Sequence, residues 1–210
     1  TFYNLSNMVL AIAGNFDPDE AEKILGEELK PAQALAQARE IIRQRYNEPR
    51  EAAQREIIQE LDVSEPLFFF GYKLAPKEAP MEQLRQQVVY NILLEALAGS
   101  TSSYYEEMNK KGLLNAAFGT EVFSGRGYLA LLFGGESRDP KAVFASFREM
   151  AEKRREAGIA EEEFHSCQNA LYGRALRDIN NVESTASAMF SYEMMGLSLF
   201  DVPEMIAGIT

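Results

Sequence analysis

Hydrophobic and polar residues follow two different periods along this chain. Between residues 81 and 97 the apolar positions recur at intervals of three and four, which predicts a long helix at the centre of the core. Its buried positions are expected to be Leu84, Val88, Ile92 and Leu93. Elsewhere the apolar residues are nearly continuous, as in residues 67–72, and such runs predict strands. We interpret Phe68-Phe69-Phe70 in that run as part of a strand buried on both faces, not as a ligand-binding cluster.

The same patterns, bounded by glycine, proline and capping residues, divide the whole chain into elements. Strands are predicted at residues 8–13, 51–62, 67–72, 114–123 and 128–133. Helices are predicted at residues 18–29, 32–46, 81–97, 103–111, 139–157, 160–180, 182–195 and 203–208. This order predicts the α+β class, with an antiparallel sheet and helices packed on one of its faces.

Residues 97–133 carry the most specific pattern, because a long helix, a break, a short helix and a hairpin rarely follow one another in this order. The break reads Gly-Ser-Thr-Ser-Ser-Tyr-Tyr-Glu-Glu-Met-Asn-Lys-Lys-Gly-Leu from Gly99. This stretch resembles the second, non-catalytic repeat of the insulinase-like (pitrilysin-type) zinc metallopeptidases. Residues 8–19 look like the strand and turn that end such a repeat, and residues 158–173 look like its late helix.

The resemblance implies a domain organisation. Residues 1–46 would be the end of a preceding repeat, and residues 47–210 would form the second repeat, with the fold of pitrilysin and mitochondrial processing peptidase. The chain would then be a fragment of a longer bacterial protein. We further predict that residues 8–13 pair into the main sheet, either within the chain or by exchange with a second copy in a swapped homodimer.

Charge and cysteine content narrow the function classes. The chain has 32 acidic and 21 basic residues and a net charge of -11, which argues against binding to nucleic acid or to an anionic membrane surface. Solubility explains this acidity more simply than an acidic, substrate-attracting cavity does. The single cysteine, Cys167, cannot form an internal disulfide, and we expect a cytoplasmic location.

The chemistry of the insulinase-like family depends on a His-x-x-Glu-His motif, which supplies two zinc ligands and a general base. This chain has one histidine, His165, so the motif cannot be written. His165 could share a helix face with Glu161 or Glu162, but Cys167 is two positions away and cannot join that face. We therefore predict no catalytic residue, no metal ligand and no cofactor in this chain, with zinc expected only in a catalytic repeat elsewhere.

The resemblance also suggests where a substrate would be contacted. In active members the second repeat contributes an arginine before the Gly-Leu pair and a tyrosine after it. These positions fall on Met108 and Asn115 here, and the changed residues match better a subgroup of paired bacterial proteins in which one partner has lost the zinc motif. Ser103, Tyr104, Met108 and Asn115 are the predicted substrate contacts. The structural alternative is that Met108 only packs on the hairpin.

The leading functional hypothesis is a non-catalytic half of a zinc metallopeptidase. It would close a peptide-binding chamber opposite a zinc-bearing repeat, carried by the same polypeptide or by a homologous partner chain. A peptide would be the substrate of the complete assembly. The alternative hypothesis is a purely structural or interaction subunit that binds no peptide.

Overall fold

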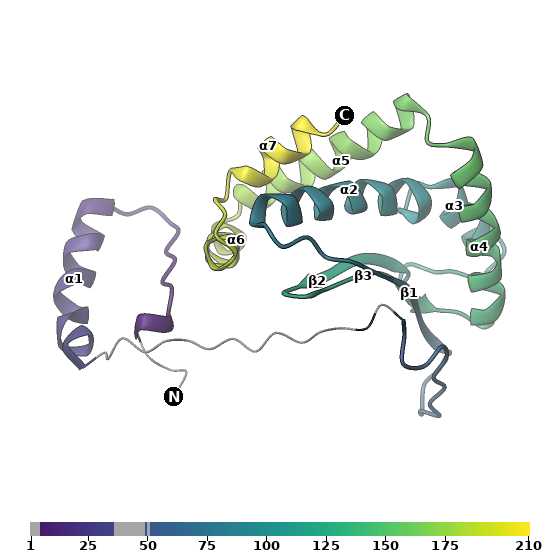
Figure 1. Cartoon of the computed structure of the whole chain (residues 1–210), viewed down its shortest axis with the longest axis horizontal. Helices are drawn as coiled ribbons and strands as arrows, with labels where there is room; N and C mark the ends of the chain where they lie inside the picture. Colours follow the sequence, from purple (N-terminus) through teal and green to yellow (C-terminus); the bar gives the residue numbers. More distant parts are fainter. Residues whose placement is uncertain (1–4, 36–48, 50) are drawn as a thin grey trace. The chain divides into compact units, whose positions relative to one another are not determined.

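The computed structural model describes residues 5–35, 49 and 51–210 (Figure 1). The chain divides into two compact units. One contains Thr1–Gln44 and Arg174–Pro203, and the other contains Arg45–Gly173 and Glu204–Thr210. The sequence did not suggest that residues 174–203 would group with the N-terminal residues. The assignment of the chain to parts of two repeats stays a prediction.

The larger unit is built on an antiparallel sheet. Its three strands are β1 (Leu67–Leu74), β2 (Gly119–Gly125) and β3 (Tyr128–Glu136), in the spatial order β1-β3-β2. A tight turn joins β2 to β3, with Gly125 paired to Tyr128 and Gly127 at a φ of 88°. That dihedral lies in the left-handed region, which glycine adopts without steric cost.

Helices cover one face of this sheet, as the sequence predicted (Figure 1). α2 (Pro80–Ala98) packs against β2, and α4 (Pro140–Ala157) packs against β1 and the short helix α3 (Ser103–Lys110). Side-chain caps fix where α3 and α4 begin: Ser102 accepts a hydrogen bond from the Tyr105 amide, and Asp139 accepts one from the Ala142 amide.

The main core lies between the sheet and these helices. Its centre is an aromatic cluster in which the Phe133 ring centroid lies 4.3 Å from that of Phe147 and 5.0 Å from that of Phe70. The buried members of the core are Phe68, Leu94, Ala98, Tyr104, Met108, Leu114, Leu131, Phe133, Val143 and Phe147. The core therefore draws on every element that covers the inner face.

The helix α2 is buried at two sets of positions. Leu84, Val88 and Ile92 are buried as predicted, but Leu93 is only partly buried, and its neighbour Leu94 belongs to the main core. The residues at both sets of positions are apolar, so each set needs a packing partner that removes its surface from water. Figure 1 draws α2 between the sheet and the first half of α5 (Glu161–Ile179), which explains why two sides of the helix are apolar.

The C-terminal end of the larger unit is tied to α5 by one buried amide. The Gln168 side chain donates from Nε2 to the carbonyl oxygens of Ile206 and Ile209, at 2.7 and 2.8 Å. These carbonyls lie at the end of α7 (Asp201–Gly208), where a helix leaves its last C=O groups without intrahelical partners. Gln168 therefore satisfies backbone groups that would otherwise lose their hydrogen bonds on burial.

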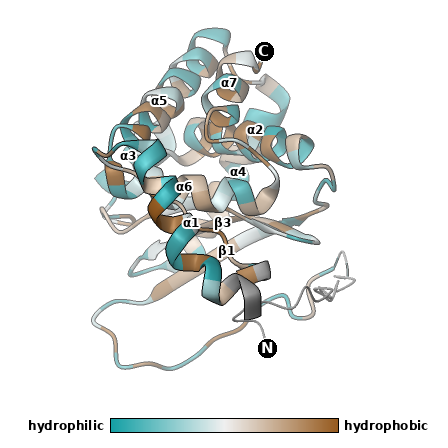
Figure 2. Cartoon of the chain, turned by 90° about the vertical axis from the view of Figure 1, so that its left-hand side faces the viewer, coloured by the Kyte–Doolittle hydropathy of each residue, from teal (hydrophilic) through white to brown (hydrophobic). Residues whose placement is uncertain are grey.

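The smaller unit contains a short 3-10 helix η1 (Leu5–Asn7), α1 (Pro18–Leu35) and α6 (Val182–Met195), together with the end of α5 and the first residues of α7. The Asp17 carboxylate caps α1 by accepting from the amides of Asp19 and Glu20. Hydrophobic and hydrophilic residues alternate along α1 (Figure 2). The predicted helix at 18–29 is confirmed but runs on to Leu35, with Pro31 inside it. The predicted helix at 32–46 lies outside the described residues from position 36 onwards.

Two predicted strands are wrong. Residues 8–13 form no strand, and the described sheet contains only β1, β2 and β3, so the predicted strand is not observed; an exchange with a second copy stays a prediction. Residues 51–62 are also without regular structure and are exposed throughout. A strand needs a neighbour to satisfy its backbone groups, and an apolar pattern cannot report whether one is present. Residues 114–118 form a loop before β2 rather than its first half.

Candidate functional site: the open face of the sheet

The two faces of the sheet differ in how they are covered. Side chains alternate along β1, so that Phe68 is 8% exposed and its neighbour Phe69 is 79% exposed. The register extends this alternation across all three strands, because Phe69 pairs with Gly134, and Gly134 pairs in turn with Gly119. We call the outward side the open face, and its residues include Leu67, Phe69, Gly71, Gly119, Glu121, Leu132, Gly134 and Glu136.

Glycines give the open face its relief. A Cβ atom at Gly134 would overlap the Phe69 ring, so the ring lies directly against the backbone of β3. A Cβ atom at Gly71 would likewise meet a methyl group of Leu132 at 2.8 Å. At Gly119, by contrast, a Cβ atom would meet nothing within 4 Å. The row formed by Phe69, Gly134 and Gly119 therefore has an aromatic wall at one end and bare backbone at the other.

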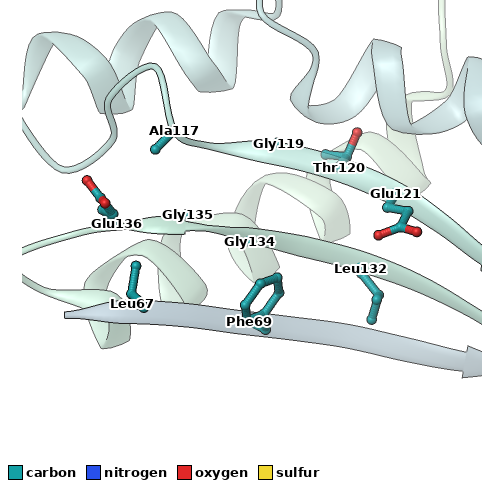
Figure 3. A pocket seen from close by; sticks show the side chains of 10 residues that line it. All are labelled: Leu67, Phe69, Ala117, Gly119, Thr120, Glu121, Leu132, Gly134, Gly135 and Glu136. Carbon is teal, nitrogen blue, oxygen red and sulfur yellow. The ribbon is translucent and has the colours of Figure 1, made fainter. Parts of the chain in front are cut away.

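This relief forms a hollow of about 410 Å³ on the open face. Figure 3 shows its lining, which is Leu67, Phe69, Ala117, Gly119, Thr120, Glu121, Leu132, Gly134, Gly135 and Glu136. Its volume is within the range of small-molecule and side-chain binding sites, and its walls are largely apolar. An apolar hollow of this kind can accommodate apolar groups of a ligand or of another protein.

Two carboxylates stand at opposite ends of the hollow, Glu121 on β2 and Glu136 on β3 (Figure 3). The Asn115 side chain donates from Nδ2 to Oε2 of Glu136 at 3.2 Å. Asn115 also accepts a hydrogen bond from the Ala117 amide at 2.8 Å, which fixes the loop that forms the rim. The lining contains no lysine or arginine, so its formal charge is negative.

The four predicted substrate contacts lie in different environments. Tyr104 and Met108 are 3% and 1% exposed and belong to the main core. The Tyr104 hydroxyl donates to the carbonyl oxygen of Val143, and burial raises the pKa of this tyrosine above its usual value. Both side chains are buried in the main core, and a substrate contact at any of the four positions stays a prediction. Ser103 and Asn115 are exposed, and of the two Asn115 hydrogen bonds to the rim of the hollow.

His165 is placed as its spacing predicted. Its Nε2 atom lies 3.8 Å from a carboxylate oxygen of Glu161, and its Nδ1 atom lies 3.2 Å from Oε1 of Gln168. Across residues 5–35, 49 and 51–210, no three histidine, cysteine or acidic side chains are grouped as metal ligands would be. With a single histidine in the chain, the residues do not fit the zinc site of an insulinase-like catalytic repeat. Within the same described residues, no helix has both the length and the apolar character needed to cross a membrane.

Comparison with known proteins identifies the family. The model of the family described as "Peptidase M16 inactive domain" matches residues 1–171. The chain belongs to the peptidase M16 family. The match to the inactive domain agrees with the missing zinc motif and with the predicted absence of activity in this chain alone.

Relatives of this M16 chain are about twice as long. It is 28% identical over its whole length to a Bacillus subtilis (strain 168) protein described as "Uncharacterized zinc protease YmfH", of which it spans 49%. Among solved structures, it resembles a putative M16-like peptidase from Alicyclobacillus acidocaldarius, with a TM-score of 0.81 and 23% identity. The match covers 93% of this chain and 47% of that one. A protease from Helicobacter pylori gives a TM-score of 0.76 at 15% identity, covering 94% of this chain and 48% of that one.

The hollow of this M16 chain was not predicted from the sequence. We interpreted Phe69 as buried on both faces, and that interpretation is wrong. The signal was present in the glycines of β2 and β3, because a glycine inside a strand often marks a close approach to other groups. Gly119 and Gly134 share a row, however, only once the register is known.

Proposed function

We propose that this chain is the non-catalytic half of an M16 zinc metallopeptidase and that its open face closes a peptide-binding chamber opposite a zinc-bearing repeat. The observation that carries the proposal is the one-sided cover of the sheet, which leaves Phe69 79% exposed and the hollow on the face opposite the helices α2 and α4 of the larger unit. The zinc-bearing repeat would belong to the same polypeptide or to a homologous partner chain. The relatives that are about twice as long support such a pairing.

The division of labour follows from the residues that are present. This chain has a single histidine and cannot supply a His-x-x-Glu-His motif, so under this proposal it would not polarise or attack the peptide bond. Its contribution would be to hold the peptide in an extended form and to keep water away from part of it. Apolar surface on the open face favours such binding, because burying apolar groups is favourable in proportion to the area removed from water. The chain alone would therefore bind peptide weakly and hydrolyse none.

Photocrosslinking tests this proposal directly. A benzoylphenylalanine at position 69 would place a crosslinker on the open face, and the same residue at position 172 would place it on α5. Tyr172 is a matched control, because it is also an exposed aromatic residue of the larger unit. On irradiation with a biotinylated, unstructured peptide, position 69 should form a peptide adduct and position 172 should not.

The same experiment separates the two candidate functions. A purely structural subunit would give no peptide adduct at either position, even when the zinc-bearing partner is added. Equal adducts at both positions would indicate non-specific contact and would contradict the proposal. Peptide hydrolysis by the purified chain, abolished by a chelator, would contradict the assignment of catalysis to another repeat.

A further inference from the structure

The register of the strands divides the hollow into three rows. Along β3 the outward positions are Leu132, Gly134 and Glu136, each two residues after the last. On β2, Glu121 lies opposite Leu132 and Gly119 lies opposite Gly134. The glycine row is therefore midway between two rows that each carry a carboxylate. At a rise of roughly 3.3 Å per residue, the backbone positions of the outer rows are about 13 Å apart.

An extended peptide has the same period as these rows. Its side chains at positions i, i+2 and i+4 point to one side, and the first and last of them are about 13 Å apart along the backbone. A peptide lying along the strands would therefore present three successive side chains to the three rows. The middle side chain would enter the hollow above Gly119, beside the Phe69 ring that covers Gly134.

The middle row accepts a large apolar side chain. Space exists there at Gly119, where a Cβ atom would meet nothing within 4 Å, whereas the Phe69 ring covers Gly134. The walls are formed by that ring and by the apolar groups of Leu67 and Leu132. A polar side chain in this position would lose hydrogen bonds to water without gaining protein partners. An aromatic or long aliphatic residue would bury its surface against these walls.

The outer rows accept basic side chains. Glu121 and Glu136 are their charged groups, and no lysine or arginine lines the hollow to neutralise them. The basic residue on the outward side of β1 is Lys73, which pairs with Ala130, one row beyond the Glu121 end. The net charge of -11 adds a long-range attraction for cationic segments.

We propose that the open face selects extended peptide segments with a large apolar residue flanked, two positions before and after, by lysine or arginine. The selectivity rests on the proposed function, because it requires that this face holds a peptide. Glu121 and Glu136 would act as the charge-recognition residues, and the glycine row would act as the apolar subsite.

Binding of four labelled peptides, measured by fluorescence anisotropy, tests this selectivity. In a Gly-Ser background their central segments would be Arg-Ser-Phe-Ser-Arg, Glu-Ser-Phe-Ser-Glu, Arg-Ser-Ser-Ser-Arg and the respaced Phe-Ser-Ser-Arg-Arg. The first should bind about tenfold more tightly than the glutamate-flanked peptide, since two exposed ion pairs are replaced by two repulsions. It should also bind more tightly than the respaced peptide, which has the same composition and charge.

Two variants assign the preference to the hollow. The double substitution Glu121→Gln and Glu136→Gln should bring the arginine- and glutamate-flanked peptides to within about twofold of each other. Gly119→Leu should weaken binding of the first peptide by at least about fivefold, because its side chain fills space that is empty in the wild type. Glu156→Gln, an exposed charge change on α4, is the control and should alter nothing. Circular dichroism would establish that each variant is folded.

Each outcome decides the matter. If all four peptides bind equally and the position-69 crosslink persists, the open face holds peptide without selectivity and this inference is wrong while the proposed function stands. If the order of affinities holds but the Gln substitutions leave it unchanged, the carboxylates named here are not the recognition groups. If no peptide binds and no crosslink forms, both the inference and the proposed function are wrong.

Discussion

The same three strands carry two faces with different tasks. On the inner face Phe68 and Phe133 are buried in the main core, and Phe70 packs against it. On the open face Phe69 lies over a glycine and remains 79% exposed. Neighbouring residues in the sequence therefore have different roles: Phe68 stabilises the core, and Phe69 forms part of the exposed surface.

This difference explains why large apolar residues alternate with glycines on the open face. Cross-strand pairs of large side chains usually stabilise a sheet. Here the pairs are Phe69 with Gly134 and Leu132 with Gly71, so each large residue covers a partner without a side chain. Each large side chain therefore fills the space above its glycine partner, while the space above Gly119 stays empty. The inner face should dominate stability, and the open face should dominate binding.

The largest effect is expected from a truncation on the inner face. Phe133→Ala removes a ring that contacts Phe70 and Phe147 and should lower the free energy of unfolding by about 3–5 kcal/mol. The matched change on the open face, Phe69→Ala, should cost less than about 1 kcal/mol, because its ring is mostly in water already. Denaturant unfolding of both variants measures the contrast. Equal losses would show that the two faces are not distinct in stability.

A smaller contrast is expected within the helix that covers the inner face. Leu94→Ala on α2 should cost about 2–5 kcal/mol, because Leu94 lies in the main core. Leu93→Ala, one position earlier, should cost less, since Leu93 is only partly buried. Urea titrations of the two variants would establish the order. A larger loss for Leu93 would mean that the side of α2 that carries Leu93 contributes more to packing than the side that carries Leu94.

The smallest effect concerns Tyr104, whose hydroxyl donates to Val143 in the core. Tyr104→Phe should cost about 0.5–1.5 kcal/mol near neutral pH through the lost hydrogen bond. Burial raises the pKa of Tyr104, so above about pH 10 an unfolded tyrosine loses its proton while the folded one keeps it, and wild-type stability falls. The difference between wild type and variant should therefore narrow above pH 10. A difference that grows with pH in unfolding titrations would contradict this.

Much of the fold could be predicted from local patterns, and the failures have one cause. The helix 81–97, the strand 67–72 and the hairpin after Gly119 are confirmed because period, caps and turn residues agree there. Residues 8–13 have an apolar run and residues 51–62 a loose alternation of apolar and polar residues, but neither forms a strand. Periodicity describes a segment that suits a sheet, whereas strand formation depends on a neighbour that the pattern does not specify.

The candidate site was harder to predict than the fold, for a related reason. A sequence shows that Tyr104 and Met108 are in a helix, but their burial depends on which side α4 packs. Asn115 reaches the rim through its hydrogen bond to Glu136, a residue 21 positions away in the chain. The hollow forms where glycines on two strands carry no side chain. Gly119 and Gly134 lie in one row only because of the strand register, which the sequence does not show.

The most direct test of the account compares two adjacent leucines on β3. Leu131 faces the helices and Leu132 lines the hollow, so their methyl groups report on opposite faces of the same strand. In methyl-labelled protein, titration with the Arg-Ser-Phe-Ser-Arg peptide should shift the NMR signals of Leu132 and Leu67 in proportion to binding. The signals of Leu131 and Leu129 should stay in place. Peptide binding that shifts the inner pair and leaves Leu132 and Leu67 unchanged would show that the open face is not the binding surface.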